Sequence, residues 1–214
     1  PFLKLVDRGT LTATLFELLK ANTRIPVELE GDLYSLIESN DVGARRLREM
    51  LDEFRLRDLG SLAEHIIVNS RRAVLKEIAR VPRGSYRASL TIDGKEAPIT
   101  LAAVVTVSKG GVAVDYAGTS PTSSYGINVP LAYTTAYTVF GLHCALARAV
   151  PNNAGSLSAY RVSAPPGSIL NPARPRAVSA RHIVGQMLPD VVFGCLRQAI
   201  PDRVPAEGTS CLWL

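Results

Sequence analysis

The chain has 214 residues, of which 47% are hydrophobic and 20% are charged, and its formal net charge is +5. This length and composition are typical of one large or two small ordered domains and exclude a disordered protein. No apolar run approaches the ~20 residues that span a bilayer and no signal peptide opens the chain, so no membrane association is expected. Aromatic residues make up only 6% and do not alternate with basic ones, which argues against a nucleic-acid partner.

The three cysteines, Cys144, Cys195 and Cys211, fit neither a disulfide framework nor a zinc cluster, because they are few and far apart. We expect buried thiols in a reducing compartment, and therefore a cytoplasmic protein. Apolar runs at residues 2–6 and 211–214 resemble interrupted strands. Since the backbone groups of a strand need partners, we expect the chain to be the middle part of a longer polypeptide.

Residues 1–81 have apolar side chains at helical spacing and are predicted to form a mainly helical segment. Thr10 can cap a first helix that ends near Asn22. A second helix is predicted from Pro26 to residue 54 with one interruption, and a third over residues 61–78. Gly31 and Gly43 can mark kinks or close contacts in the second helix.

From residue 82 the pattern alternates, which predicts a mixed segment of strands and helices over residues 82–214. The predicted strands are residues 85–92, 99–107, 112–116, 160–164 and 168–170, and the second and third of them form a hairpin. A nearly uncharged helix over residues 130–149 is expected to be buried between layers or subunits. A last helix is predicted over residues 183–199. The fold class is therefore α+β, with an incomplete domain at both ends.

The 74 residues between Asp115 and Asp190 contain no Asp or Glu. Five arginines lie in this stretch: Arg148, Arg161, Arg174, Arg176 and Arg181. Such a region presents a positive field, which favours an anionic ligand or an acidic partner surface. The alternative is that several of these arginines pair with acids elsewhere or are solvated in loops.

Arg181 and His182 are the candidate catalytic residues, because free amides at a predicted helix start and nearby guanidinium groups can hold an anion. Asn128, Asn152 and Asn153 are the candidate substrate-binding residues. For Asn152 and Asn153 the alternative is that they brace a tight polar turn. We expect all five residues to share one concave surface.

The remaining histidines, His65 and His143, are expected to be packed or hydrogen-bonded residues of the core. No two histidines stand at the spacing of metal ligands, and no acidic cluster lies near them. We therefore expect no complete metal site in this chain.

Five segments in the same order resemble those of the hydantoinase B family. They are residues 114–121 (VDYAGTSP), 126–132 (GINVPLA), 151–156 (PNNAGS), 164–168 (APPGS) and 201–208 (PDRVPAEG). The family also contains the C-terminal half of 5-oxoprolinase and the alpha subunit of acetone and acetophenone carboxylases. Residues 181–186 (RHIVGQ) are closer to microbial hydantoinase B sequences than to the oxoprolinase branch.

The resemblance implies part of an enzyme that hydrolyses a small cyclic amide, such as a hydantoin or 5-oxoproline, with the help of ATP. A hydantoinase A-type subunit is implied as the partner that binds ATP, so a hetero-oligomer is expected. A divalent metal is implied in an upstream His/Asp segment outside this chain, and no cofactor is expected on the chain itself. The alternatives are an alpha-type subunit of an acetone carboxylase, or a scaffold that docks the A-type partner without catalytic residues.

Overall fold

The chain divides into two compact units, residues 1–61 and 62–214, and the computed structural model describes residues 3–206. Helices and a mixed sheet make up these units, so the predicted α+β class is confirmed. The sequence pattern changes after residue 81, but the units divide after Ser61, because the third helix packs with the sheet. Within residues 3–206, no helix is long and apolar enough to cross a membrane.

Unit 1 begins with a hairpin of two short antiparallel strands, β1 (Val6–Asp7) and β2 (Thr10–Leu11). Within the described part of the apolar run at residues 2–6, Val6 is in a strand and residues 3–5 are not. Helix α1 (Ala13–Ala21) follows, and its N-cap residue is Thr12. The predicted cap, Thr10, belongs to the second strand instead.

Helix α2 (Pro26–Glu53) runs without interruption, so the predicted break is wrong. Gly31 and Gly43 face open space and mark no close contact; each costs the helix about 1 kcal/mol relative to Ala without breaking it. None of the residues of α2 is buried. The contact with α1 includes buried Phe16, whose ring centroid lies 5.3 Å from that of Tyr34.

Unit 2 contains a four-stranded sheet in the order β3–β4–β5–β6. The strands are β3 (Gly84–Ile92), β4 (Ile99–Ser108), β5 (Gly111–Asp115) and β6 (Tyr160–Ser163). The first three are antiparallel neighbours, as the alternating pattern predicts, whereas β6 pairs with β5 in parallel. A parallel pair needs a crossover, and residues 116–159 supply it with a helix.

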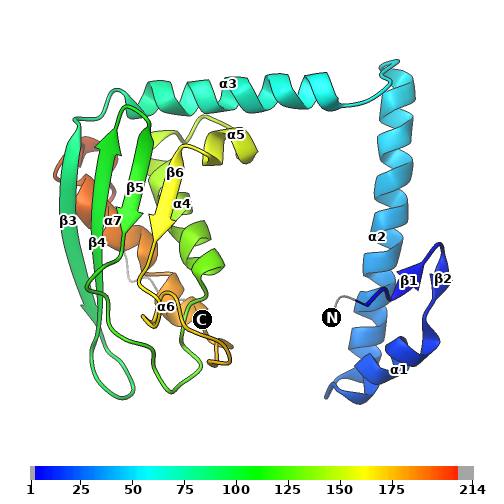
Figure 1. Cartoon of the computed structure of the whole chain (residues 1–214). Helices are drawn as coiled ribbons and strands as arrows, with labels where there is room; N and C mark the ends of the chain where they lie inside the picture. The colour runs from blue at the N-terminus through cyan, green and yellow to red at the C-terminus, as the bar shows by residue number, and fades with distance from the viewer. Residues whose placement is uncertain (1–2, 207–214) are drawn as a thin grey trace. The chain divides into compact units, whose positions relative to one another are not determined.

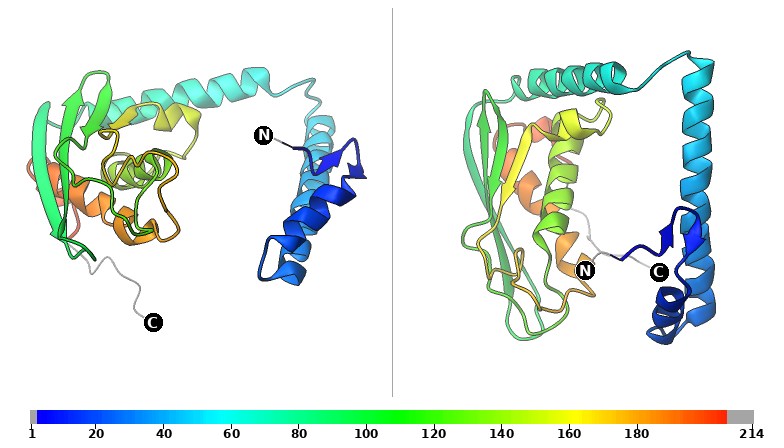
Figure 2. Two further views of the ribbon diagram at one scale, coloured as in Figure 1. Left: turned by 60° about the horizontal axis from the view of Figure 1, so that its bottom comes forward. Right: turned by 45° about the vertical axis from the view of Figure 1, so that its right-hand side comes forward.

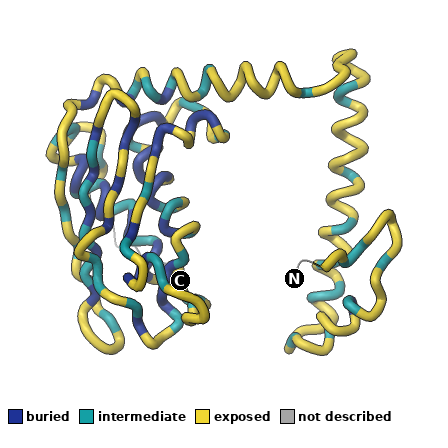
Figure 3. Tube along the Cα trace, viewed as in Figure 1, coloured by how far each residue is buried: buried dark blue, intermediate teal, exposed yellow. Residues whose placement is uncertain are grey.

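Helices α4 (Leu131–Leu146) and α7 (Leu188–Leu196) lie along one face of the sheet (Figure 1). Alternate residues of β4, among them Leu101 and Val105, are buried under these helices, and the residues between them are half-buried (Figure 3). The period of two follows from the pleat of the strand. Helix α3 (Gly60–Ile78) adds Val74 and Ile78 from its last turns to the same core.

The uncharged helix α4 is buried on one side only. Gly141 lies so close to α7 that an added Cβ would be 2.9 Å from the Cα atom of Pro189. Inside the core, the hydroxyl groups of Tyr116 and Thr138 are hydrogen-bonded at 2.7 Å, and burial raises the pKa of Tyr116 above its usual value. On the other side, Phe140 is 59% exposed. The expected burial therefore holds for one face of the helix.

Three segments after α4 differ from the prediction. A short helix, α5 (Ala154–Leu157), is present where none is predicted. Residues 168–170 form no strand and contribute only one isolated bridge, between Pro121 and Ser168. The predicted last helix is two helices, α6 (His182–Gly185) and α7, followed by the 3-10 turn η1 (Pro201–Arg203). Proline has no N–H and crowds the carbonyl four residues earlier, so Pro189 prevents one continuous helix.

Candidate functional site

Two loops, residues 121–130 and 171–181, meet at the N-terminal end of α4, and Asn128 joins them. Its side chain is buried; Oδ1 accepts a hydrogen bond from the Ser123 amide at 2.9 Å. Nδ2 donates to the carbonyls of Ser123, Tyr125 and Ala177 at 2.9, 3.0 and 3.0 Å. Every polar atom of the Asn128 side chain is therefore used to hold the loops together. Its predicted role in substrate binding stays a prediction, with this bracing role beside it.

The backbone strengthens the same junction. The Ala180 amide donates to the Gly126 carbonyl at 2.8 Å, and the Val129 amide donates to the Ile169 carbonyl at 2.7 Å. A Cβ atom on Gly126 would lie 2.7 Å from Oγ of Ser179, so the two loops approach closely here and a larger residue would require the Ser179 side chain to move.

Arg181 is exposed, and its guanidinium group is held from two directions. Its carbon Cζ lies 5.7 Å from the ring centroid of Tyr133, and Nη1 donates to the Val178 carbonyl at 3.2 Å. The Tyr133 ring is itself stacked on that of Tyr137, with centroids 4.5 Å apart. The stacked rings form a shelf that orients the guanidinium group while its other N–H groups stay available to a ligand.

His182 is exposed at the first position of α6, next to Arg181. Part of the predicted anion pocket at this helix start is closed, because two of its backbone amides are already used. The Ile183 amide already donates to the Ala180 carbonyl at 3.1 Å, and the Gly185 amide donates to the Arg181 carbonyl at 2.9 Å.

A carboxylate from outside the acid-free stretch reaches this end of the molecule. Glu96 accepts hydrogen bonds from the Ser123 hydroxyl at 2.7 Å and from the Ser124 hydroxyl and amide. The bond from the Ser124 hydroxyl is the main cause that lowers the pKa of Glu96, and the charge of Arg176 adds to it. The positive field predicted from the sequence is thus partly compensated near Arg176, whereas Arg174 and Arg181 form no ion pair with another residue in the range 3–206.

Asn152 and Asn153 lie at the other end of α4. Asn153 caps α5, since its Oδ1 accepts from the amides of Gly155 and Ser156 at 2.9 and 3.1 Å. Its Nδ2 donates to Oγ of Ser70 on α3 at 2.8 Å. Asn153 therefore braces the turn, which is the alternative that the sequence leaves open, while Asn152 is exposed.

The predicted common surface for the five candidates is therefore wrong. Figures 1 and 2 show α5 and α6 at opposite ends of α4, whose length of about 24 Å follows from a rise of 1.5 Å per residue. The structure brings Arg181, His182 and the loop braced by Asn128 together, and leaves Asn152 and Asn153 apart. The individual roles remain predictions.

The two other histidines differ from each other. His143 is a hydrogen-bonded core residue, as predicted: Nε2 lies 2.8 Å from the Val150 carbonyl and Nδ1 lies 3.2 Å from the Tyr160 hydroxyl. A ring with its proton on Nε2 satisfies both contacts. His65, in contrast, is exposed on α3 and is hydrogen-bonded to Asn69, so the expected core position is wrong.

The described cysteines also differ in their exposure to solvent. Cys195 is buried, and burial raises the pKa of its thiol to about 11. Cys144 is exposed, against the prediction, because it lies on the free side of α4. Cys211 falls outside the described residues. Across residues 3–206, no three His, Cys, Asp or Glu side chains lie together in the way a metal site would require.

Two features of the site escape the sequence analysis. The shelf under Arg181 is built from Tyr133 and Tyr137, whose spacing of four residues indicates neighbours on one helix face. Glu96 is the other, and no local pattern connects it to serines 27 and 28 residues later. The first could be found from the sequence, and the second needs the fold.

Comparison with known proteins assigns the chain to a family. The model of the family described as hydantoinase B/oxoprolinase matches residues 1–214. The chain belongs to the hydantoinase B/oxoprolinase family. A protein of Pseudomonas sp. (strain NS671), named as the B-type subunit of a D-/L-hydantoinase, is 26% identical over 218 residues. That match covers 95% of this chain and 37% of the relative, so the chain spans little more than a third of that relative's length.

Solved structures of two enzymes are similar to this family member. An ATP-dependent caprolactamase from Pseudomonas jessenii matches with a TM-score of 0.85 and 25% identity, over 95% of this chain and 36% of the enzyme. The nucleotide-free structure of acetone carboxylase matches with a TM-score of 0.80 over 97% of this chain and 30% of that one. At 14% identity, the second similarity concerns the fold alone.

Proposed function

We propose that this chain is part of the B-type component of an enzyme that opens a cyclic amide at the expense of ATP. The observation that carries the proposal is the similarity to the ATP-dependent caprolactamase over 95% of the chain. The name of the hydantoinase relative and the oxoprolinase in the family description support it, because hydantoins, 5-oxoproline and caprolactam all contain an amide bond within a ring.

The proposed reaction requires a positively charged group that stabilises negative charge on oxygen, and an oriented arginine can supply it. In the proposed reaction, ATP bound by an A-type partner phosphorylates the amide oxygen and leaves ADP. One water adds to the activated carbonyl carbon, and the ring C–N bond breaks as the nitrogen takes a proton. A second water releases phosphate from the acyl phosphate and leaves a carboxylate. The phosphoryl transfer and the addition of each water place negative charge on oxygen, which a fixed guanidinium group stabilises.

Arg181 is the residue of this chain best suited to that task. It is exposed, it pairs with no acid among residues 3–206, and Tyr133 and the Val178 carbonyl fix its orientation. His182 is next to it, and its imidazole can donate or accept a proton in the reaction. Asn128 supports both residues indirectly, since it anchors the loop that precedes them.

Two alternatives make different predictions. The fold similarity to acetone carboxylase favours a carboxylase subunit as the second candidate. A scaffold that only docks the ATP-binding partner would bind that partner without contributing a residue to turnover.

The experiment uses the protein expressed from its complete reading frame, copurified with the A-type subunit. ADP release is measured with a hydantoin, 5-oxoproline, caprolactam, and acetone with bicarbonate. We expect ADP release that depends on one of the cyclic amides and equals the amount of ring-opened product. ADP release with acetone and bicarbonate alone would establish the carboxylase instead. A complex with no turnover of any of these substrates would contradict the hydrolase.

A further inference from the structure

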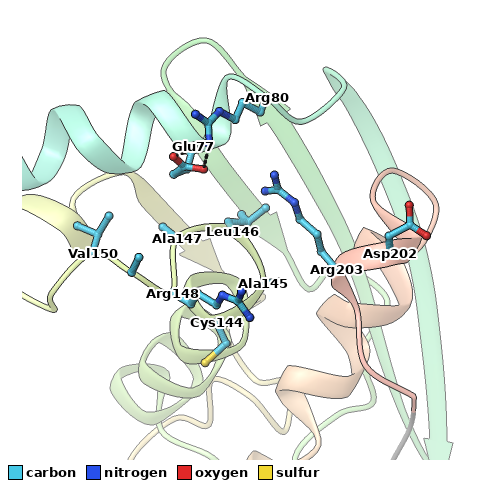
Figure 4. A pocket seen from close by; sticks show the side chains of 11 residues that line it. Glu77, Arg80, Cys144, Ala145, Leu146, Ala147, Arg148, Val150, Asp202 and Arg203 are labelled. Carbon is cyan, nitrogen blue, oxygen red and sulfur yellow. Dashed lines mark hydrogen bonds and ion pairs between the residues drawn. The ribbon is translucent and has the colours of Figure 1, made fainter.

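A second basic region lies at the C-terminal end of α4, around a cavity of about 500 Å³ (Figure 4). It is walled by the end of α3, by the last turn of α4 with the three residues after Ala147, and by η1. All of these elements belong to unit 2. The cavity is separate from the Arg181 end, because the length of α4 lies between them.

Three arginines line this cavity, and of these Arg80 has an ion pair within residues 3–206. Nη1 of Arg80 donates to the two carboxylate oxygens of Glu77 at 2.8 and 2.7 Å. Arg148 and Arg203 make no ion pair and no side-chain hydrogen bond with any residue in the described range. Figure 4 shows Arg203 extending from η1 toward the last turn of α4, while the Asp202 carboxylate points to the other side of η1.

The floor of the cavity is apolar and fixed. Leu146 and Ala147 are both only 3% exposed and form part of the core. Cys144, one turn before Arg148, carries the exposed thiol of the lining. A cavity of this size is within the range of small-molecule sites, which combine apolar walls with a few polar groups.

We propose that this cavity binds a small organic or inorganic oxyanion, with a carboxylate or a phosphate group held between Arg148 and Arg203. Planar guanidinium groups from two different elements match the oxygens of such a group and can each donate two hydrogen bonds. Arg80 adds positive charge at the rim but is already engaged by Glu77. The assignment does not depend on the proposed reaction at the other end of α4.

The competing explanation is structural. Cationic side chains near the last turn of a helix stabilise it through the helix dipole, without any ligand. Under that explanation, removal of Arg148 and Arg203 lowers thermal stability but changes no binding property of the cavity.

Alkylation of Cys144 reports on the cavity directly. The protein from the complete reading frame is treated with iodoacetamide, and labelling at Cys144 is followed by peptide mass spectrometry, which separates it from Cys195 and Cys211. Inorganic phosphate and glutarate are titrated at constant ionic strength, so that screening does not imitate binding. We expect one of them to slow labelling saturably, by about tenfold at ten times its Kd. The anion that protects identifies which group the cavity prefers.

The double variant Arg148→Ala/Arg203→Ala is expected to abolish this protection, and the matched control Arg174→Ala to keep it. A second measurement needs no variant: the rate ratio of anionic iodoacetate to neutral iodoacetamide at Cys144 should exceed that of free N-acetylcysteine by about threefold to tenfold. The proposal is overturned if neither anion protects, if the double variant is protected equally, or if the ratio is no higher than that of the free thiol.

Discussion

At each end of α4 an asparagine holds the neighbouring turn in place, and arginines give that end a positive charge. At the N-terminal end, Asn128 holds two loops together and Arg181 is left exposed on its aromatic shelf. At the C-terminal end, Asn153 caps α5 and ties it to α3, and Arg148 and Arg203 line a cavity. The difference is that Arg181 is held by Tyr133 and the Val178 carbonyl, whereas Arg148 and Arg203 have no ion pair or side-chain hydrogen bond with any described residue. Asparagines in turn motifs here position the chain, and the arginines remain available to anions.

The largest stability effect is expected at Asn128. Replacement by Ala leaves buried polar groups of both loops without partners, which should lower the free energy of unfolding by about 3 kcal/mol. Chemical denaturation measures the change. Asn152→Ala is the control and should stay within about 0.5 kcal/mol of the parent, since Asn152 is exposed. A loss below about 1 kcal/mol in the Asn128 variant would contradict the role of Asn128 in holding the two loops together.

The next largest effect on stability is expected at Gly185. A Cβ atom at this position would clash with the ring of Tyr133, so Gly185→Ala forces α6 away from the shelf and should cost about 2 kcal/mol. Gly43→Ala is the matched glycine control: its surroundings are open, and it should stabilise α2 by up to about 1 kcal/mol. Thermal melts of the two variants should therefore shift in opposite directions. Equal shifts would show that the shelf does not require the close approach.

Asn153 tests the corresponding bracing role at the C-terminal end of α4. Asn153→Ala removes the cap of α5 and the bond to Ser70, and should cost about 1–2 kcal/mol. Asn153→Asp keeps an acceptor for the two amides but loses the donor to Ser70, so it should recover part of that loss. Denaturation midpoints of both variants give the two contributions separately. If Asp recovered nothing, the cap would not be the main function of this side chain.

The smallest effect is expected at Glu96, and it depends on pH. Hydrogen bonds lower the pKa of this carboxyl group in the folded state, so its stabilising contribution is present above pH 4.5 and is lost as the pH falls through the lowered pKa. Glu96→Gln should therefore be less stable than the parent at pH 7, and the difference should be smaller at pH 3. Melting temperatures at the two pH values test this. A constant difference between parent and variant would contradict the link between Glu96 and the serine loop.

The regular parts of the fold follow from the sequence. Strands β3, β4 and β5 and helices α1, α2 and α3 lie close to their predicted positions, because alternation and helical spacing are strong there. The predictions fail where tertiary contacts decide: α5 exists because Asn153 caps it, and Pro189 divides the last helix. The sequence pattern predicts β6 as a strand, but its parallel pairing with β5 depends on tertiary contacts and was not predictable.

The candidate site was predictable only in part. Arg181 and His182 stand out by residue type and lie together as expected, but spacing along the chain does not reveal that Asn153 lies one helix length away from them. The carboxylate of Glu96 is supplied by a segment outside the acid-free stretch, so a field inferred from linear composition overstates the positive charge at this end. Distances between loops depend on which end of a helix each loop follows.

The central claim is that Arg181 contacts the reacting charge and that its surroundings only position it. The direct test is Arg181→Ala in the complete enzyme, assayed for ADP release and ring opening, with the melting temperature measured on the same sample. We predict a loss of about 100- to 1,000-fold in turnover with little change in melting temperature. Arg181→Lys should recover only part of the rate, because it cannot form a two-pronged hydrogen bond. Near-normal turnover per folded molecule in the Ala variant would contradict the claim.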